Sequence, residues 1–126
     1  MSLMRAGFYR ELVHGDPDGP SLRMAAGRSV PDLARIAAYL DGAPTLAATG
    51  SLVDDVLVAG RPGVAPLEIA TDGVWVWPRD LGYYVRVHAV SLPEAFVRHM
   101  RDRQWTPPVL SVDELVAAEM SFMLSS

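Results

Sequence analysis

The side chains best suited to chemistry lie close together near the middle of the chain. They are Trp75, Trp77, Arg79, Asp80, Tyr83 and His88. Tryptophan and tyrosine are enriched at the hot spots of protein interfaces, so one Trp with Tyr83 could form an exposed binding surface. An Arg–Asp pair with a histidine could instead serve as acid, base or ligand contact. The structural alternative is that the rings belong to the core and that the charges favour a helix start.

The composition excludes several classes of enzyme. The chain has no cysteine, so a disulfide framework, a thiol nucleophile and thiolate metal sites are absent. It has no lysine, which excludes a Schiff-base lysine and the lysine of a phosphate-binding P-loop. Neither a His-Glu-x-x-His motif nor a Gly-x-Ser-x-Gly elbow is present. We therefore identify no catalytic residue and no cofactor, and the sequence favours a non-enzyme without deciding the matter.

Two acidic segments resemble cation sites only in part. His14, Asp16 and Asp18 have the spacing of the start of a calcium loop, but the later ligands of such a loop are missing. Asp54 and Asp55 are adjacent, yet adjacent side chains on a helix point about 100° apart. We expect turn-forming aspartates in the first segment, a solvated acidic pair in the second, and no metal site.

Charge and hydropathy argue against nucleic-acid and membrane binding. The net charge is −4, and Arg98, Arg101 and Arg103 gather at the end of a predicted helix, where the helix dipole favours cations. No apolar run reaches the roughly 18–20 residues of a membrane-spanning helix. No signal peptide is visible. We expect a cytoplasmic protein, and we expect His88 to be partly buried and His99 to be solvated.

A predicted β-hairpin positions the central side chains. Alternating apolar residues over 67–71 and 74–77 flank Asp72-Gly73, which favours a two-residue turn with positive φ. The period of two puts Trp75 and Trp77 on one face of the ribbon. Pro78 should end the second strand, and a helix should follow from about Arg79.

Other elements follow from apolar spacing and capping residues. Helices are predicted at 21–26, at 31–41, from 79 through 88, from 93 through about 103 and at 112–124. Weaker patterns favour a first strand at 8–13, with a short helix as the alternative. Residues 43–50 should form a tight connection. Residues 51–58 favour a short helix, with a strand as the alternative.

The last predicted helix, 112–124, begins with a capping box of Ser111 and Glu114. Its apolar stripe consists of Val112, Leu115, Val116, Met120 and Met123. Methionine commonly fills gaps in cores, so we expect the stripe to dock on its own domain. Homodimerisation through this helix is the alternative.

These elements predict one α+β domain covering residues 1–126. We expect a small, mostly antiparallel sheet centred on the hairpin at about 67–77, with three to four helices packed on one face. The length suits a single domain, and half of the residues are hydrophobic, enough for a core.

The central motif resembles that of small uncharacterised actinobacterial proteins. It reads TDGVWVWPRDLGYYV at 71–85 and is followed by LPEAF at 92–96. A high-GC genome agrees with the absence of lysine and asparagine and the abundance of Ala, Gly, Pro, Arg and Val. The general build is also similar to that of small immunity proteins of bacterial toxin systems.

The sequence thus favours a non-enzymatic protein-binding module, of immunity or inhibitor type, with a protein as its partner. The alternative is a small hydrolase or small-molecule-binding protein with a pocket near the Trp/Tyr-rich hairpin and helix, which would use Arg79, Asp80, Tyr83 or His88.

Overall fold

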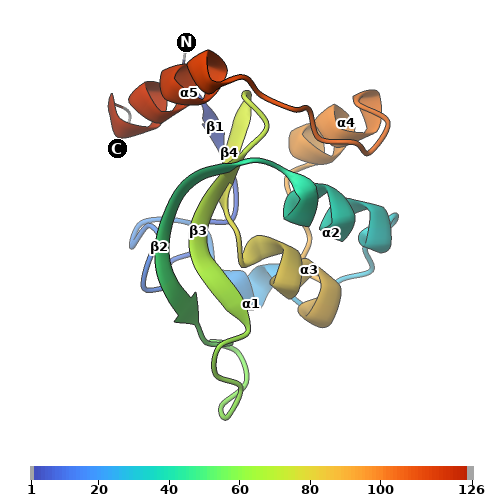
Figure 1. Ribbon diagram of the computed structural model, residues 1–126. Helices are drawn as coiled ribbons and strands as arrows, with labels where there is room; N and C mark the ends of the chain where they lie inside the picture. Colours follow the sequence, from blue (N-terminus) through green and yellow to red (C-terminus); the bar gives the residue numbers. More distant parts are fainter. Residues whose placement is uncertain (1, 125–126) are drawn as a thin grey trace.

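The strands form one sheet, with helices along one side of it (Figure 1). The computed structural model describes residues 2–124. The elements are β1 (Met4–Arg5), α1 (Leu22–Ala25), α2 (Leu33–Gly42), β2 (Thr45–Val53), β3 (Ala65–Thr71), β4 (Trp75–Pro78), α3 (Leu81–His88), α4 (Glu94–Asp102) and α5 (Val112–Leu124). The sheet order is β1-β4-β3-β2, with β1 parallel to β4 and the other pairs antiparallel. The predicted α+β class is confirmed.

Figure 1 shows where the helices lie relative to the sheet. Helices α2, α3 and α4 lie on one side, whereas α5 crosses one end beside β1. Within residues 2–124, no helix is both long and apolar enough to span a membrane.

The predicted hairpin is present, but its turn lies one residue later than expected. Asp72 stands opposite Trp75, whose carbonyl accepts the Asp72 N–H at 3.2 Å, so Gly73 and Val74 form the turn. Gly73 has a φ of 90°, which glycine adopts without steric cost. The shift has a local cause, because Asp72 Oδ1 accepts the N–H groups of Val74 at 2.9 Å and Trp75 at 2.7 Å.

The two edge strands differ from the prediction. Residues 8–13 form turns, and the first strand is Met4–Arg5 instead. Strand β2 occupies most of the connection expected at 43–50 and the first three residues of the segment 51–58. The short helix expected at 51–58 is therefore wrong, and the strand alternative is correct only for residues 51–53. Strand β1 is paired with β4, which is distant in sequence, and β2 is paired with β3. Local propensity does not encode either pairing.

The helices agree with the predicted ones, with small shifts at their ends. Helix α1 begins after Ser21, whose Oγ accepts a first-turn N–H at 3.4 Å. Helix α2 begins about two residues late, because Asp32 adopts a left-handed φ of 58°. The capping box of α5 is confirmed: Glu114 accepts the Ser111 N–H at 2.9 Å, and Ser111 Oγ accepts the Glu114 N–H at 3.1 Å.

Candidate functional site

The two tryptophans of the hairpin belong to the core. Both are buried, and their rings pack on Phe96 with centroid distances of 4.4 Å for Trp75 and 5.2 Å for Trp77. Trp77 Nε1 donates to the Leu40 carbonyl at 3.3 Å. Aromatic rings packed in this way contribute mainly to stability. The interpretation of these rings as core residues is therefore correct for both Trp75 and Trp77.

Arg79 joins the end of α2 to the sheet. Its guanidinium donates to the carbonyls of Leu40 at 3.1 Å, Asp41 at 3.2 Å and Ala43 at 3.0 Å. It also donates to Thr45 Oγ1 at 2.8 Å. The last carbonyls of a helix have no partner within the helix. Arg79 supplies that partner, so its role is structural.

Each of the three histidines lies beside a buried aspartate. The pairs are His14–Asp80, His88–Asp55 and His99–Asp72. The three aspartates are at most 5% exposed. An ionised carboxylate is stable in a protein interior only when polar partners replace its water. The histidines are therefore among the polar partners of these buried carboxylates.

Asp55 accepts hydrogen bonds from two residues of α3. Its Oδ2 accepts from His88 Nε2 at 2.6 Å and from Tyr83 Oη at 2.7 Å, and its Oδ1 accepts the Leu57 N–H at 2.8 Å. Burial raises the pKa of Asp55, but the hydrogen bonds from these three groups outweigh burial and hold that pKa below its ordinary value. Because an ionised carboxylate only accepts, His88 Nε2 must carry the proton.

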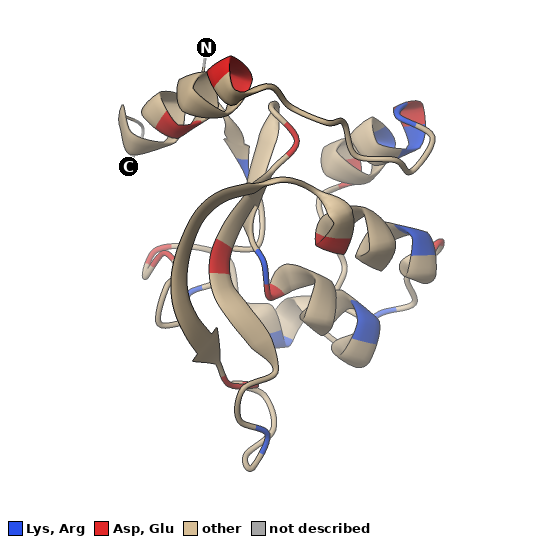
Figure 2. Cartoon of the chain, in the orientation of Figure 1, with Lys and Arg blue, Asp and Glu red and all other residues tan. Residues whose placement is uncertain are grey.

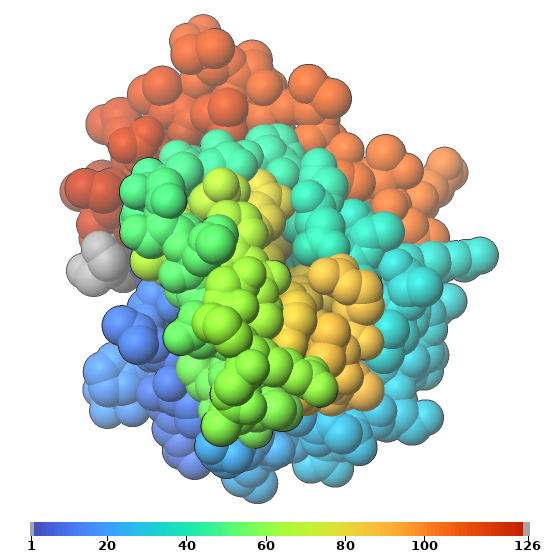
Figure 3. Space-filling model, turned by 60° about the horizontal axis from the view of Figure 1, so that its bottom comes forward, coloured from blue at the N-terminus to red at the C-terminus, as the bar shows by residue number. Residues whose placement is uncertain are grey.

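The Asp55 contacts fasten the loop between β2 and β3 to α3, and Figure 3 shows these two segments side by side. The prediction of a solvated acidic pair is correct for Asp54, which is exposed, and wrong for Asp55. The prediction that His88 is partly buried is confirmed, because its side chain is 15% exposed.

Asp80 contacts the N-terminal loop. His14 Nε2 lies 3.2 Å from Asp80 Oδ1 and 3.1 Å from Oδ2, and His14 Nδ1 is buried without a hydrogen-bond partner among the described residues. The loop is also shaped by Asp16, whose Oδ1 accepts the Asp18 N–H at 2.9 Å, as expected for a turn-forming aspartate. His14 and Asp16 border a groove of about 600 Å³.

Asp72 links the hairpin to two helices. Its Oδ2 accepts from Tyr39 Oη at 2.6 Å and lies 3.1 Å from His99 Nε2. Arg103 Nε also lies 3.1 Å from that nitrogen and can donate to it. With a proton on His99 Nε2, this nitrogen donates to the Asp72 carboxylate. Without that proton, it accepts from the Arg103 guanidinium. The prediction of a solvated His99 is wrong, because its side chain is only 21% exposed.

The predicted site residues do not meet in one cavity. Tyr83 and His88 come together at the carboxylate of Asp55, whereas Arg79 and Asp80 make contacts elsewhere. Among residues 2–124, no hydrogen bond joins a Ser or Thr hydroxyl to a histidine, so no described His–Asp pair has the nucleophile of a catalytic triad. The same residues contain no group of three His, Cys, Asp or Glu side chains placed to hold a metal ion.

An exposed apolar surface follows α5, and we call it the α5 stripe. It consists of Val112, Val116, Met120, Met123 and Leu124, which are 76, 50, 60, 67 and 84% exposed. The opposite side of the helix docks on the domain, where Ala118 is buried and the Phe122 ring stacks on Phe8 at 6.1 Å. The expectation that the predicted stripe docks on the domain is therefore wrong for Val112, Val116, Met120 and Met123, which are exposed, whereas Leu115 is half-buried. The spacing of the stripe could not reveal this, because α5 is apolar on both sides.

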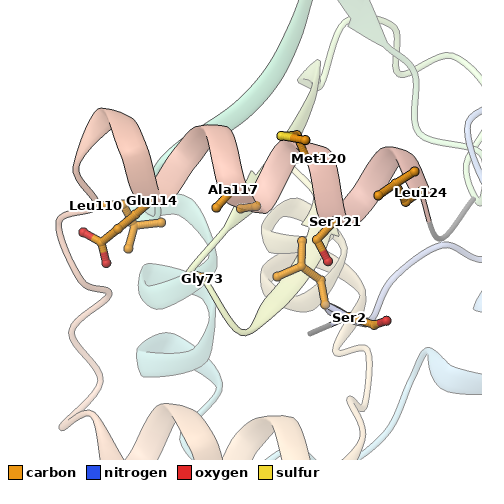
Figure 4. Close-up of a pocket in the computed structure, with 10 residues that line it drawn as sticks. Ser2, Gly73, Leu110, Glu114, Ala117, Met120, Ser121 and Leu124 are labelled. Carbon is orange, nitrogen blue, oxygen red and sulfur yellow. The ribbon is translucent and has the colours of Figure 1, made fainter.

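A groove of about 660 Å³ lies beside the α5 stripe. It is lined by residues of α5, of the hairpin turn and of the N-terminal segment, including Leu3, Gly73, Leu110, Ala117, Met120 and Leu124. Figure 4 shows the hairpin turn at Gly73 facing the side of α5 that carries Ala117 and Ser121. Met120 and Leu124 belong to both the groove and the stripe. The two features therefore form one continuous apolar surface.

Comparisons with protein-family models, curated proteins and solved structures find no match to this chain. The choice of site therefore depends on geometry. The three His–Asp pairs lie inside the fold and hold its segments together. The α5 stripe and its groove are exposed and contribute little to the core, which makes them the candidate functional site.

Proposed function

We propose that this protein is a non-enzymatic protein-binding module that uses the α5 stripe and the adjoining groove as its binding surface. The observation that supports this proposal is the exposure of five large apolar side chains along one helix. Apolar patches of more than a few hundred Å² on soluble proteins commonly mark interaction sites. Met120 and Met123 add flexible thioether side chains, which adapt to the shape of a partner.

An immunity or inhibitor protein is the type of module that we propose. Such a protein acts by covering its target, so it needs a binding surface and no catalytic residue. The buried His–Asp pairs favour a rigid body behind the stripe, and a rigid surface loses less conformational entropy on binding. The net charge of −4 favours a target with basic residues around the apolar contact.

Partner capture with matched variants tests the proposal. Tagged wild type and Met120→Glu serve as baits in an extract of the native host, at low and high salt. We expect a stoichiometric protein that wild type retains in high salt, because apolar contacts are not screened, and that Met120→Glu loses. Met24→Glu on α1 is the control, because Met24 is 68% exposed and helix α1 lies at the end of the molecule opposite to α5 (Figure 1).

The result that overturns the proposal is equally clear. If neither another protein nor a second copy of the chain binds in a way that depends on Met120, the α5 stripe is not a protein-binding surface. Both variants should fold, because each substitution changes an exposed side chain on a helix. Circular dichroism checks that they do.

A small hydrolase or small-molecule-binding protein is the second candidate function. The observation in its favour is the His14–Asp80 pair beside the groove of about 600 Å³. An imidazole oriented by a buried carboxylate is a common general base. Thermal-shift screening with small metabolites would support this function if a ligand stabilised wild type and not His14→Gln. The absence of any such ligand from a broad set would leave the protein-binding function alone.

A further inference from the structure

The charges of α5 are distributed unevenly along the helix. All three are acidic: Asp113 and Glu114 lie in the first turn, Glu119 lies near the middle, and the last turn has no charge (Figure 2). Two such helices packed in parallel would place their acidic first turns together, and like charges in contact are destabilising. In the antiparallel arrangement, each acidic first turn lies beside the uncharged last turn of its partner.

The sizes of the side chains in the α5 stripe are distributed in the same way. The small Val112 and Val116 lie in the first half, and the longer Met120, Met123 and Leu124 lie in the second half. Antiparallel packing therefore places small side chains opposite large ones, which lets the two surfaces interdigitate. Parallel packing would place large against large and leave gaps between the valines.

We propose that the partner of the α5 stripe is the α5 stripe of a second copy of this chain, packed antiparallel in a two-fold symmetric homodimer. This inference rests on the proposed protein-binding function and names the partner for that surface. A two-fold axis perpendicular to the helices gives this antiparallel arrangement, with each copy presenting the same surface to the other. In this arrangement the acidic first turns of the two helices lie apart, and the small side chains of each stripe face the large ones of the other.

The area of the stripe places the proposed dimer among the smaller, transient interfaces. Helix α5 has 13 residues and is therefore about 20 Å long at a rise of 1.5 Å per residue. Burying its five exposed side chains on both copies removes on the order of 1,000 Å² from water, which is near the lower limit for a specific interface. We therefore expect a dimer that forms at micromolar concentration and dissociates on dilution.

Sedimentation velocity of the complete chain tests the proposal. Between about 1 and 200 μM, the mass should rise from the monomer value of 13.7 kDa towards twice that value. Met120→Glu should raise the dimer dissociation constant about 100-fold or more, because it buries an unpaired carboxylate. Met24→Glu should leave the constant unchanged. A Met120→Glu protein that dimerises like wild type would place the contact elsewhere and overturn the proposal.

Cysteine cross-linking tests the relative orientation of the two α5 helices. Because the chain has no cysteine of its own, each introduced thiol is the single thiol of its protein. Val112→Cys and Leu124→Cys proteins, mixed and oxidised at a concentration where the dimer forms, should give a disulfide between the two variants. Each variant alone should cross-link poorly. Efficient cross-linking of each variant to itself would indicate parallel packing and overturn the antiparallel arrangement.

The homodimer and the broader function can fail separately. A monomeric mass at every concentration, with a host protein whose capture depends on Met120, would overturn the homodimer and leave the protein-binding function standing. A monomeric mass with no Met120-dependent partner would overturn both. A dimer lost in Met120→Glu and retained in Met24→Glu supports both.

Discussion

Replacing Asp72 by alanine tests whether the buried carboxylates hold this fold together. The carboxylate of Asp72 accepts from Tyr39 Oη at 2.6 Å and from the N–H groups of Val74 at 2.9 Å and Trp75 at 2.7 Å. Alanine leaves these three donors without an acceptor, at a cost of about 1–3 kcal/mol for each that stays buried. The turn can relax and expose part of this set, so we expect the unfolding free energy to fall by about 3–5 kcal/mol. The total for a domain is only about 5–15 kcal/mol.

Two milder variants separate the contributions to that loss. Asp72→Asn keeps an acceptor oxygen for the turn amides and should cost about 1–2 kcal/mol, and Tyr39→Phe removes one donor and should cost about 1 kcal/mol. In the Asp72→Ala background, Tyr39→Phe should be neutral or stabilising, because the hydroxyl has already lost its partner. Urea unfolding followed by tryptophan fluorescence measures these values, since Trp75 is buried next to the turn.

The outcome that refutes this reasoning is specific. If Asp72→Ala costs less than about 1 kcal/mol, water satisfies the three donors and the carboxylate is not essential. If Tyr39→Phe costs the same in both backgrounds, the bond between Tyr39 and Asp72 contributes nothing measurable. The first result would assign the stability of the hairpin to core packing, whereas the second would leave only the turn hydrogen bonds of Asp72 to Val74 and Trp75.

Further predictions concern acid stability and the end of α2. Burial raises the pKa of Glu11, but hydrogen bonds from backbone N–H groups at the start of α1 and from Ser21 lower it to about 2, and the pKa of Asp55 is also lowered. A group whose pKa is lower in the folded than in the unfolded chain stabilises the fold at a pH above its unfolded pKa. The unfolding free energy, measured by urea unfolding, should therefore fall as the pH drops from about 5 towards 2, with a shallower fall in Asp55→Asn. A rise in the unfolding free energy over this range would contradict the reasoning. Arg79→Met should cost about 2 kcal/mol in thermal unfolding, whereas Arg35→Met, which changes an exposed residue of α2, should stay within about 0.5 kcal/mol; equal effects would refute the role of Arg79.

Local chemistry explains the parts of the fold that could be predicted. Asp72-Gly73 indicated the hairpin, since few residue pairs suit a tight turn. Ser111 and Glu114 located the start of α5 through a capping box that depends on four consecutive residues. Even there, the turn was misplaced by one residue, because the Asp72 side chain accepts the N–H groups of Val74 and Trp75 and its backbone N–H pairs with the Trp75 carbonyl.

Long-range contacts explain the parts that could not be predicted. Asp54 is exposed and Asp55 is buried, although they are neighbours of the same type. The difference depends on Tyr83 and His88, which are 28 and 33 residues away in sequence. The candidate surface was missed for another reason: α5 is apolar on its docked side as well as its exposed side, so periodicity does not show which side faces solvent.

The three buried aspartates also bear on how the chain reaches this fold. Their bonds to Tyr39, His88 and His14 span 33, 33 and 66 residues. Such contacts form only after long loops close, so folding should be slower than in a helical bundle of the same length, and the body should open as one cooperative unit. Within residues 2–124, none of these aspartates bonds to α5. The last helix is therefore held by contacts of its own, among them the burial of Ala118 and the stacking of Phe122 on Phe8, so its docking should depend on these contacts and not on the buried aspartates.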